Sequence, residues 1–326
     1  MLITLQHDSC FSMSAETIPD SQALKKDSSY ILKTRAKEYY GQTNLSHLSI
    51  KSAFCGDALF ETSNGRYMPD KDTYLILNPE QRYFLTVNSR IEVEGIIIFF
   101  AQGFAGEVLR SMTAPTGLLL DEPHPPEVAR LEFIQRIYPR DPKLSLFLNA
   151  LWDSLDTLTA EQGWYEEQLH GILEQLLQIH WSVRREIESL PAVRAATREE
   201  IYRRVYRARD YLAASLDQPL TLNEMARVAC LSPNHFMRTF KQVFQQTPYQ
   251  YLTSLRLERA KRLLHQTELP ITEICFLVGF DSPGSFSWLF HRRVGISPQA
   301  YRKQNKLSLL QKGDFQEAPR PHLDLL

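Results

Sequence analysis

The chain has 326 residues, a formal net charge of −1, and 43% hydrophobic and 23% charged residues. This composition is typical of a folded globular protein and excludes a disordered chain, and the length exceeds that of one ordinary core, so we expect two domains. The longest apolar run, residues 96–101, is far shorter than the roughly 20 residues that cross a bilayer. The N-terminus has no basic leader, so we expect a cytoplasmic protein without membrane attachment.

The sequence offers little that indicates catalysis. The four cysteines are scattered without a CxxC pair, so we expect reduced thiols and no zinc site. Residues 1–140 contain three histidines and no HxH pair, whereas an iron or manganese enzyme of the barrel type needs clustered histidines and a carboxylate. Gly-rich phosphate loops and GxSxG nucleophile motifs are also missing from the sequence. We therefore expect no enzyme, no catalytic residues, no metal and no cofactor.

Residues 1–140 are predicted to form a β-rich domain. Segments rich in aromatic and β-branched residues, which favour strands, lie at 74–77, 83–87 and 93–100. Turn signals separate such segments at Asn64-Gly65, Asn78-Pro79 and Asn88-Ser89. Several short strands are typical of a small barrel or sandwich. The sequence does not single out residues that line a pocket, so the effector-binding residues stay unknown.

A helical pair is predicted over residues 141–190, with helices at 143–160 and 164–190. In the second helix an apolar stripe recurs every three or four residues, at Tyr165, Leu169, Ile172, Leu176, Ile179, Val183, Ile187 and Leu190. This stripe resembles a coiled-coil seam and predicts either a homodimer contact or packing against the barrel of the same subunit. Residues 191–198 are predicted to be the interdomain linker, and residues 305–326, which lack periodicity, a disordered tail.

The last third of the chain differs from the rest in charge. Residues 1–197 carry 18 Lys and Arg against 26 Asp and Glu, whereas residues 198–304 carry 16 against 9. A basic excess of this kind is a candidate footprint for DNA phosphates, although a solvated helix face also produces one.

The basic region contains an internal repeat with a period of about 50 residues, which indicates a duplicated supersecondary unit. The stretch from Leu220, LTLNEMARVACLSPNHFMRTFKQVFQQTPYQYL, aligns with the stretch from Leu269, LPITEICFLVGFDSPGSFSWLFHRRVGISPQAYR, after one inserted residue. In the first copy Thr221 and Glu224 form a capping box, and Ser232-Pro233 then caps a second helix. In the second copy Gly279 marks the turn and Ser282-Pro283 the cap. The predicted buried faces include Met225, Phe236 and Phe240 in the first copy, and Ile274, Leu277, Val278, Phe286 and Phe290 in the second.

The opposite faces of the two second helices are predicted to contact DNA. They carry Asn234, His235, Met237, Arg238 and Lys241 in the first copy, and Gly284, Ser285, Ser287, Trp288 and Arg292 in the second. Between the copies, a helix of about 19 residues ending near Gln266 spans roughly 28 Å. Such a strut could hold two recognition helices about one DNA turn, near 34 Å, apart. For each residue a solvated helix face is the alternative, and for Met237 so is gap filling in the core.

With these motifs, residues 199–304 resemble the DNA-binding domain of the AraC/XylS family of bacterial regulators. The resemblance rests on PLTLNEMARVACLSPNHFMRTFKQVF, TPYQYLTSLRLERAKRLL and LPITEICFLVGFDSPGSFSWLFHRRVGISPQAYR. It implies that residues 233–241 and 283–292 enter adjacent major grooves of double-stranded DNA. By motif position, the implied base readers are Asn234, Met237, Arg238, Gly284, Ser287 and Trp288. It also implies a cupin-like barrel within residues 1–140 that binds a small effector.

One departure from the family concerns the second recognition helix. The family usually has arginine where Trp288 stands and lysine where His291 stands. Tryptophan can pack on a thymine methyl group or on sugars, but it cannot make the bidentate contact of arginine to guanine. We therefore expect the first unit, with Arg238, to carry most of the direct base readout.

The sequence as a whole predicts an α+β protein: an N-terminal β-rich, cupin-like domain with two dimerisation-type helices, then an all-α C-terminal domain of two helix-turn-helix units. The expected function is a sequence-specific DNA-binding transcription regulator controlled by a small-molecule effector. The alternative is a constitutive regulator whose N-terminal domain serves only dimerisation or protein contacts. Expected partners are double-stranded DNA, RNA polymerase, an effector and a second copy of the chain. The sequence does not distinguish an activator from a repressor.

Overall fold

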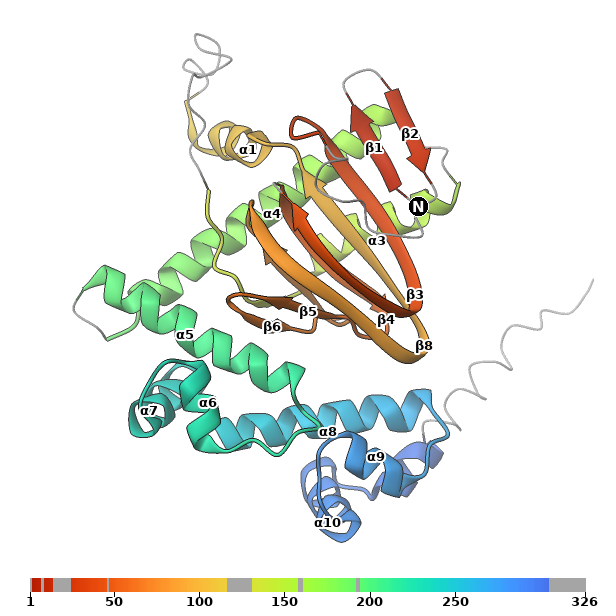
Figure 1. Cartoon of the computed structure of the whole chain (residues 1–326), viewed down its shortest axis with the longest axis vertical. Coiled ribbons are helices and arrows are strands. Elements are labelled where there is room, and N and C mark those ends of the chain that lie inside the picture. Colours follow the sequence, from red (N-terminus) through yellow and green to blue (C-terminus); the bar gives the residue numbers. More distant parts are fainter. Residues whose placement is uncertain are drawn as a thin grey trace, which may run out of the picture. The chain divides into compact units, whose positions relative to one another are not determined.

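The computed structural model describes residues 2–6, 9–13, 25–45, 47–115, 131–157, 161–191 and 194–304. The chain divides into two compact units, Met1–Ala214 with Val228–Cys230 and Ser215–Arg227 with Leu231–Leu326 (Figure 1). The first unit combines an antiparallel sheet with helices, and the described part of the second is helical. This confirms the predicted α+β architecture. The tail predicted at residues 305–326 lies outside the described residues.

The first unit is built on one nine-stranded sheet whose described strand pairs are antiparallel. Its strands are β1 (Leu2–Gln6), β2 (Ser9–Met13), β3 (Ser29–Leu45), β4 (Leu48–Cys55), β5 (Leu59–Thr62), β6 (Gly65–Tyr67), β7 (Thr73–Leu77), β8 (Gln81–Phe100) and β9 (Ile137–Pro139). The main path runs β2-β1-β3-β8-β4-β7-β9, and β5 pairs with both β6 and β8.

The long strands β3 and β8 give the sheet its curvature. Their register shifts between Ala36, which lies opposite Val93, and Glu38, which lies opposite Asn88. An irregularity of this kind bends both strands and increases their twist. On its other edge β8 pairs with β5 along its first half and with β4 along its second half. The sheet thereby curves into a nearly closed, cupin-like barrel (Figure 1).

One of the three predicted turns is wrong, because this irregularity lies within a single strand at that place. Asn88-Ser89 does not separate two strands, because segments 83–87 and 93–100 belong to the single strand β8. The turn-forming residues instead occupy the bulge, where residues 89–92 have only Lys37 opposite them on β3. The other two turn signals are confirmed. Asn64-Gly65 joins β5 to β6, and Asn78-Pro79 joins β7 to β8.

The interior of the barrel is a continuous apolar cluster, as the alternation of side chains along its strands requires. Its buried members are Tyr30, Leu32, Phe60, Tyr67, Leu75, Leu77, Tyr83, Leu85, Val87, Val93, Ile97 and Phe99. The opposite side of the sheet packs on helices. There Trp152 stacks on Phe54 of β4 with ring centroids 4.3 Å apart.

Among its described residues the first unit has the helices α1 (Phe104–Thr113), α3 (Pro142–Thr157), α4 (Gln162–Glu188) and α5 (Ala195–Ala214). The predicted helical pair is confirmed as α3 and α4, which pack against each other. Most of the predicted apolar stripe of α4 is buried within this single chain, including Tyr165, Leu169, Ile172, Leu176, Val183 and Ile187. The stripe is therefore largely buried within its own subunit.

Helix α5 begins at Ala195, inside the segment 191–198 that was predicted to be a linker. It packs on the β5–β6 hairpin and is tied to β9 by a buried carboxylate. The Asp210 carboxylate accepts the backbone N–H of Ile137 at 2.9 Å, and the Arg209 guanidinium donates to the Ile137 carbonyl at 2.6 Å. Part of the region 199–304 that was predicted as the DNA-binding domain thus packs on the sheet.

The described part of the second unit contains five helices: α6 (Leu222–Val228), α7 (Pro233–Phe244), α8 (Pro248–Gln266), α9 (Ile271–Leu277) and α10 (Pro283–Val294). One hydrophobic core joins α8, α9 and α10 through Leu257, Ala260, Leu264, Ile274, Cys275, Val278, Phe286 and Phe290. In the described part of the chain, no helix is both long and apolar enough to span a membrane. Cys55, Cys230 and Cys275 are free thiols.

Candidate DNA interface

The first helix-turn-helix unit begins with the capping box predicted at Thr221. The Glu224 carboxylate accepts the backbone N–H of Thr221 at 2.8 Å, and the Thr221 hydroxyl accepts the N–H of Glu224 at 3.3 Å. These bonds from Thr221 lower the pKa of Glu224. Two of the otherwise unpaired N–H groups at the start of α6 are therefore satisfied locally, which fixes where the helix begins.

The recognition helix α7 also begins as the sequence predicts. The Ser232 hydroxyl accepts the N–H of His235, and Pro233 occupies the first turn, where it needs no N–H partner. Phe236 and Phe240 are fully buried, and so is most of Thr239. Burial of this face leaves the other side of α7 for contacts with a partner.

The five residues predicted to contact DNA from α7 differ in exposure. Asn234, Arg238 and Lys241 are exposed and recur at four- and three-residue spacing, so they form one outward stripe. His235 and Met237 are half-buried and flank this stripe. The exposed Gln242, which follows Arg238 by four residues, lies beside the stripe and was not among the predicted contacts.

The second helix-turn-helix repeat has the same design, with one more residue between its two helices. Gly279, between α9 and α10, has φ of 85°, a backbone conformation that favours glycine. A Cβ atom at this position would lie 2.1 Å from the Leu216 carbonyl oxygen and 2.7 Å from the Arg256 guanidinium. The glycine at the turn is therefore required both by the backbone angle and by the space available.

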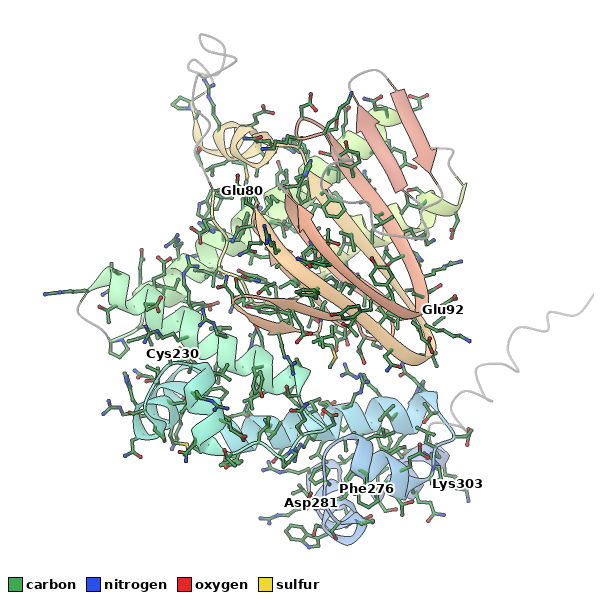
Figure 2. All side chains as sticks on the ribbon, in the orientation of Figure 1. Glu80, Glu92, Cys230, Phe276, Asp281 and Lys303 are labelled. Carbon is green, nitrogen blue, oxygen red and sulfur yellow. The ribbon has the colours of Figure 1, made fainter. Side chains whose placement is uncertain are left out.

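In helix α9 one residue that was predicted to be buried is exposed. Leu277 is 44% exposed, whereas its neighbours Cys275 and Val278 are fully buried with Ile274. The buried face of this seven-residue helix is rotated by part of a turn from the predicted one. Phe276 is also exposed, at the surface of the second unit (Figure 2).

The recognition helix α10 begins at Pro283, with the Ser282 hydroxyl accepting the N–H of Ser285. Phe286 and Phe290 are fully buried, as predicted. Of the predicted contact residues, Gly284, Ser285, Trp288 and Arg292 are exposed and Ser287 is half-buried. Gly284, Trp288 and Arg292 follow each other at intervals of four residues and so form the outward stripe of this helix.

Trp288 is the most conspicuous member of that stripe, because 62% of its surface is exposed. The Arg292 guanidinium lies over its indole ring, 5.1 Å from the ring centroid. A flat aromatic surface combined with a positive charge suits sugars, thymine methyl groups and phosphates.

Helix α8 connects the two helix-turn-helix repeats. At its start Tyr251 packs edge-on against Phe240 of α7, with centroids 5.6 Å apart. Its second half packs through Leu257, Ala260 and Leu264 on the core of α9 and α10. With 19 residues it spans roughly 28 Å. The capping box of Thr247 and Gln250 fixes its start.

Arg256 ties the segment before α6 to this central helix. Its guanidinium donates to the carbonyl oxygens of Leu216 at 2.9 Å and Gln218 at 2.8 Å. Partial burial lowers the pKa of Arg256, against the opposing effect of nearby Asp281 and Asp217. Arg256 therefore stabilises the unit from inside and is not available as a phosphate contact.

Comparison with known proteins also indicates a helix-turn-helix domain in this region. The sequence profile of a family described as "Helix-turn-helix domain" matches residues 225–304. The melibiose operon regulatory protein of Escherichia coli strain K12 is 39% identical over 93 residues, which are 28% of this chain and 31% of that protein. The HTH-type transcriptional regulator ArgR of Pseudomonas aeruginosa is 36% identical over 95 residues, 29% of each chain.

Among solved structures, the C-terminal domain of AraT, a response regulator from Geobacillus stearothermophilus, is 39% identical; the match covers 31% of this chain and 84% of that one, with a TM-score of 0.30. The chain matches less than a third of the length of the two curated regulators. The similarity to them is thus confined to the helix-turn-helix region. Residues 225–304 thus form an AraC-type helix-turn-helix domain that is similar to those of bacterial transcription regulators.

Proposed function

We propose that the protein is a sequence-specific DNA-binding transcription regulator in the bacterial cytoplasm. The observation that carries this proposal is the presence of two outward, polar or basic stripes, on α7 and α10, fixed at opposite ends of α8. The connecting helix has 19 residues and is roughly 28 Å long, which is comparable to the distance of about 34 Å between successive major-groove segments on one face of DNA. In this arrangement Asn234, Arg238 and Lys241 contact one segment, and Gly284, Trp288 and Arg292 contact the next, with His235, Met237, Ser285 and Ser287 beside them.

The first experiment is selection of genomic DNA fragments by the purified full-length protein at a stated salt concentration, since phosphate contacts make affinity depend on salt. The expected result is a motif with two conserved elements whose centres are about 10 base pairs apart. Equal recovery of all fragments, with binding that only declines with salt, would contradict sequence-specific recognition.

We further propose that the barrel senses a small molecule. Its interior contains a cavity of about 90 Å³, whose walls include Leu32, Phe60, Leu85 and Val93. Mostly apolar walls with a few polar groups are typical of small-ligand sites. The alternative, a barrel that serves only dimerisation or protein contacts, would need no such space. A filled interior would have favoured that alternative.

Within the first compact unit, packing contacts connect the cavity to helix α5. The end of α5 continues into the second compact unit. Phe60 of β5 lines the cavity, β5 forms a hairpin with β6, and β6 packs on α5. At the hairpin turn, a Cβ on Gly65 would lie 3.4 Å from the side chain of Arg207 on α5. A ligand that moves this hairpin would shift α5, whose last residue precedes Ser215. It need only bind one arrangement better than the other to change the population.

Partners other than DNA remain proposals. RNA polymerase is the expected partner of an activator of this type. A homodimer would have to use residues outside the α4 stripe, because that stripe is largely buried within the subunit. We propose no catalytic role. Among the described residues, no group of three or more His, Cys, Asp or Glu side chains is placed to hold a metal ion.

A further inference from the structure

The barrel interior contains one charged side chain in an unusual setting. Lys51 of β4 is fully buried and lines the cavity. Its ammonium donates to the Ser49 hydroxyl at 2.5 Å and lies over two aromatic rings, 4.9 Å from the centroid of Tyr83 and 5.4 Å from that of Phe99. Lysine is almost never fully buried unless an anion pairs with it.

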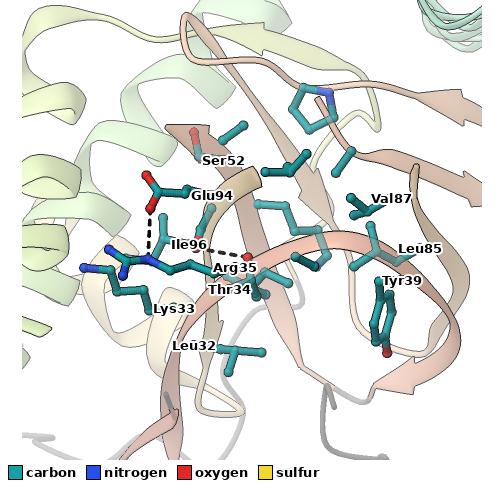
Figure 3. A pocket seen from close by; sticks show the side chains of 18 of the residues that line it. Leu32, Lys33, Thr34, Arg35, Tyr39, Ser52, Leu85, Val87, Glu94 and Ile96 are labelled. Carbon is teal, nitrogen blue, oxygen red and sulfur yellow. Dashed lines mark hydrogen bonds and ion pairs between the residues drawn. The ribbon is translucent and has the colours of Figure 1, made fainter. Parts of the chain in front are cut away.

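The other cations around the cavity already have such anions. Lys33 pairs with Asp156 at 2.7 Å. Arg35 pairs with Glu94 at 2.9 Å (Figure 3). Within the part of the chain that the structure describes, Lys51 has no carboxylate within ion-pair distance. Burial lowers the pKa of Lys51 well below its usual value. The barrel therefore holds a buried lysine amine with no anionic partner among the described residues, and a bound anion would stabilise its protonated form.

The rest of the cavity wall defines what else a ligand must carry. Its inward side chains are mainly apolar: Leu32, Ala36, Ala53, Ala58, Phe60, Leu85, Val87, Val93 and Ile97. The Thr34 hydroxyl donates to the Gly95 carbonyl oxygen at 3.1 Å (Figure 3), and the Ser52 hydroxyl donates to the Thr73 carbonyl oxygen at 3.0 Å. These two hydroxyl protons are therefore engaged by the protein itself. A sugar or a polyphosphate would find too few free donors here.

We propose that the cavity binds a small organic acid, with its carboxylate on the Lys51 ammonium and its apolar body between Phe60, Leu85 and Val93. This inference rests on the proposed sensing role of the barrel and specifies the chemical class of the effector. One buried cation matches one carboxylate, and the apolar walls match a hydrocarbon or aromatic body of limited size. The ligand anion would restore the ion pair that Lys51 lacks in the empty protein.

The test compares acids with neutral analogues of the same shape on the full-length protein. Hexanoate, benzoate and phenylacetate are titrated beside hexanamide, benzamide and phenylacetamide, with binding followed by calorimetry and by the shift of the thermal midpoint. At least one acid is expected to bind about 10- to 100-fold more tightly than its amide, the range that a hydrogen bond to a charged group gives. The Lys51→Met variant is expected to lose this preference.

Lys37→Met is the matched control, because Lys37 is an exposed lysine of β3 that does not line the cavity. It is expected to keep the preference for the acid. Equal binding of acid and amide, unchanged acid binding by Lys51→Met, or failure of all three acids to bind at 10 mM would each overturn the inference. Recovery of a DNA motif by the same preparations separates this failure from a failure of the proposed regulatory function, which would remove the motif as well.

Discussion

The Arg292 guanidinium lies over the indole ring of Trp288, 5.1 Å from its centroid, on the outward face of α10. The pair holds a large aromatic surface at the position where the family usually has an arginine. Because the ring is 62% exposed, its contacts within the chain explain little of its presence there. A contact with DNA would account for it.

Trp288→Ala is therefore expected to weaken binding of the selected DNA by about tenfold, or roughly 1.4 kcal/mol. The free energy of unfolding is expected to change by less than about 0.5 kcal/mol. Fluorescence anisotropy at fixed salt and thermal denaturation measure the two effects. Phe276→Ala is the control, since Phe276 is a similarly exposed aromatic residue on α9, at 55%. Equal losses of affinity in both variants would show that Trp288 has no specific role.

Arg238 and Lys241 are expected to contribute differently to DNA binding. If Arg238 contacts a guanine edge, Arg238→Ala costs about 1 to 3 kcal/mol and relaxes the selected motif at one position. Lys241→Ala is expected to weaken binding to all sequences alike and to reduce the slope of log affinity against log salt by about one. Repeating the selection with both variants measures the first effect, and salt titrations measure the second. An Arg238→Ala variant with an unchanged motif and a uniformly lower affinity would reassign that residue to phosphate contact.

The helix-turn-helix units were predictable because their signals are local. A capping box, a Ser-Pro cap and an apolar period each act within a few residues, so Thr221, Ser232 and Ser282 fix helix starts in any context. The repeat then supplied the relation between the two copies. Only the phase of α9 was wrong, since a seven-residue helix has too few apolar positions to define its buried face.

The barrel was less predictable because its features depend on pairing between distant segments. The residues near Asn88 do not show that the same strand, β3, pairs with the chain both before and after Asn88. A bulge within one strand was therefore predicted as a turn between two strands. Lys51 was missed for a similar reason. The segment 48–55 contains an alternation in which Ser49, Lys51 and Ala53 share one face, but the sequence does not show that this face points into a closed interior.

Alanine substitutions at two glycines of the second helix-turn-helix repeat are expected to have opposite effects on the stability of the protein. At Gly279, alanine would have φ of 85° and a Cβ 2.1 Å from the Leu216 carbonyl oxygen, so Gly279→Ala should destabilise the protein by more than about 2 kcal/mol. At Gly284, inside α10, the nearest atom to a new Cβ is 3.7 Å away. Gly284→Ala should therefore leave stability unchanged or raise it by up to about 1 kcal/mol.

Chemical denaturation measures both changes, and the DNA affinity of Gly284→Ala adds a second test. If DNA approaches α10 closely at this position, the variant binds the selected DNA more weakly although it folds at least as well. Unchanged affinity would show that Gly284 is not at the interface. A Gly279→Ala variant as stable as the wild type would contradict the described turn.

Replacing Lys51 with methionine is expected to stabilise the empty protein. Burial lowers the pKa of Lys51 in the folded chain, while the unfolded chain titrates near the usual value for lysine. Between these two pKa values the unfolded state binds more protons, so the stability of the wild type rises with pH and is lowest at and below the folded pKa. The groups around the ammonium do not offset this. They are the Ser49 hydroxyl, the Phe99 ring and Tyr83, whose pKa is itself raised by burial.

The gain from Lys51→Met should therefore exceed about 1 kcal/mol at pH 7 and shrink as the pH rises toward about 10.4, the usual pKa of lysine. In thermal denaturation this corresponds to a higher Tm, by about 2 to 4 °C for each kcal/mol. Lys37→Met, which removes an exposed lysine from the same sheet, should show no such pH-dependent gain. A Lys51→Met variant that is less stable than the wild type across this range would mean that the ammonium has an anionic partner already, and that the barrel does not hold an unpaired cation waiting for a ligand.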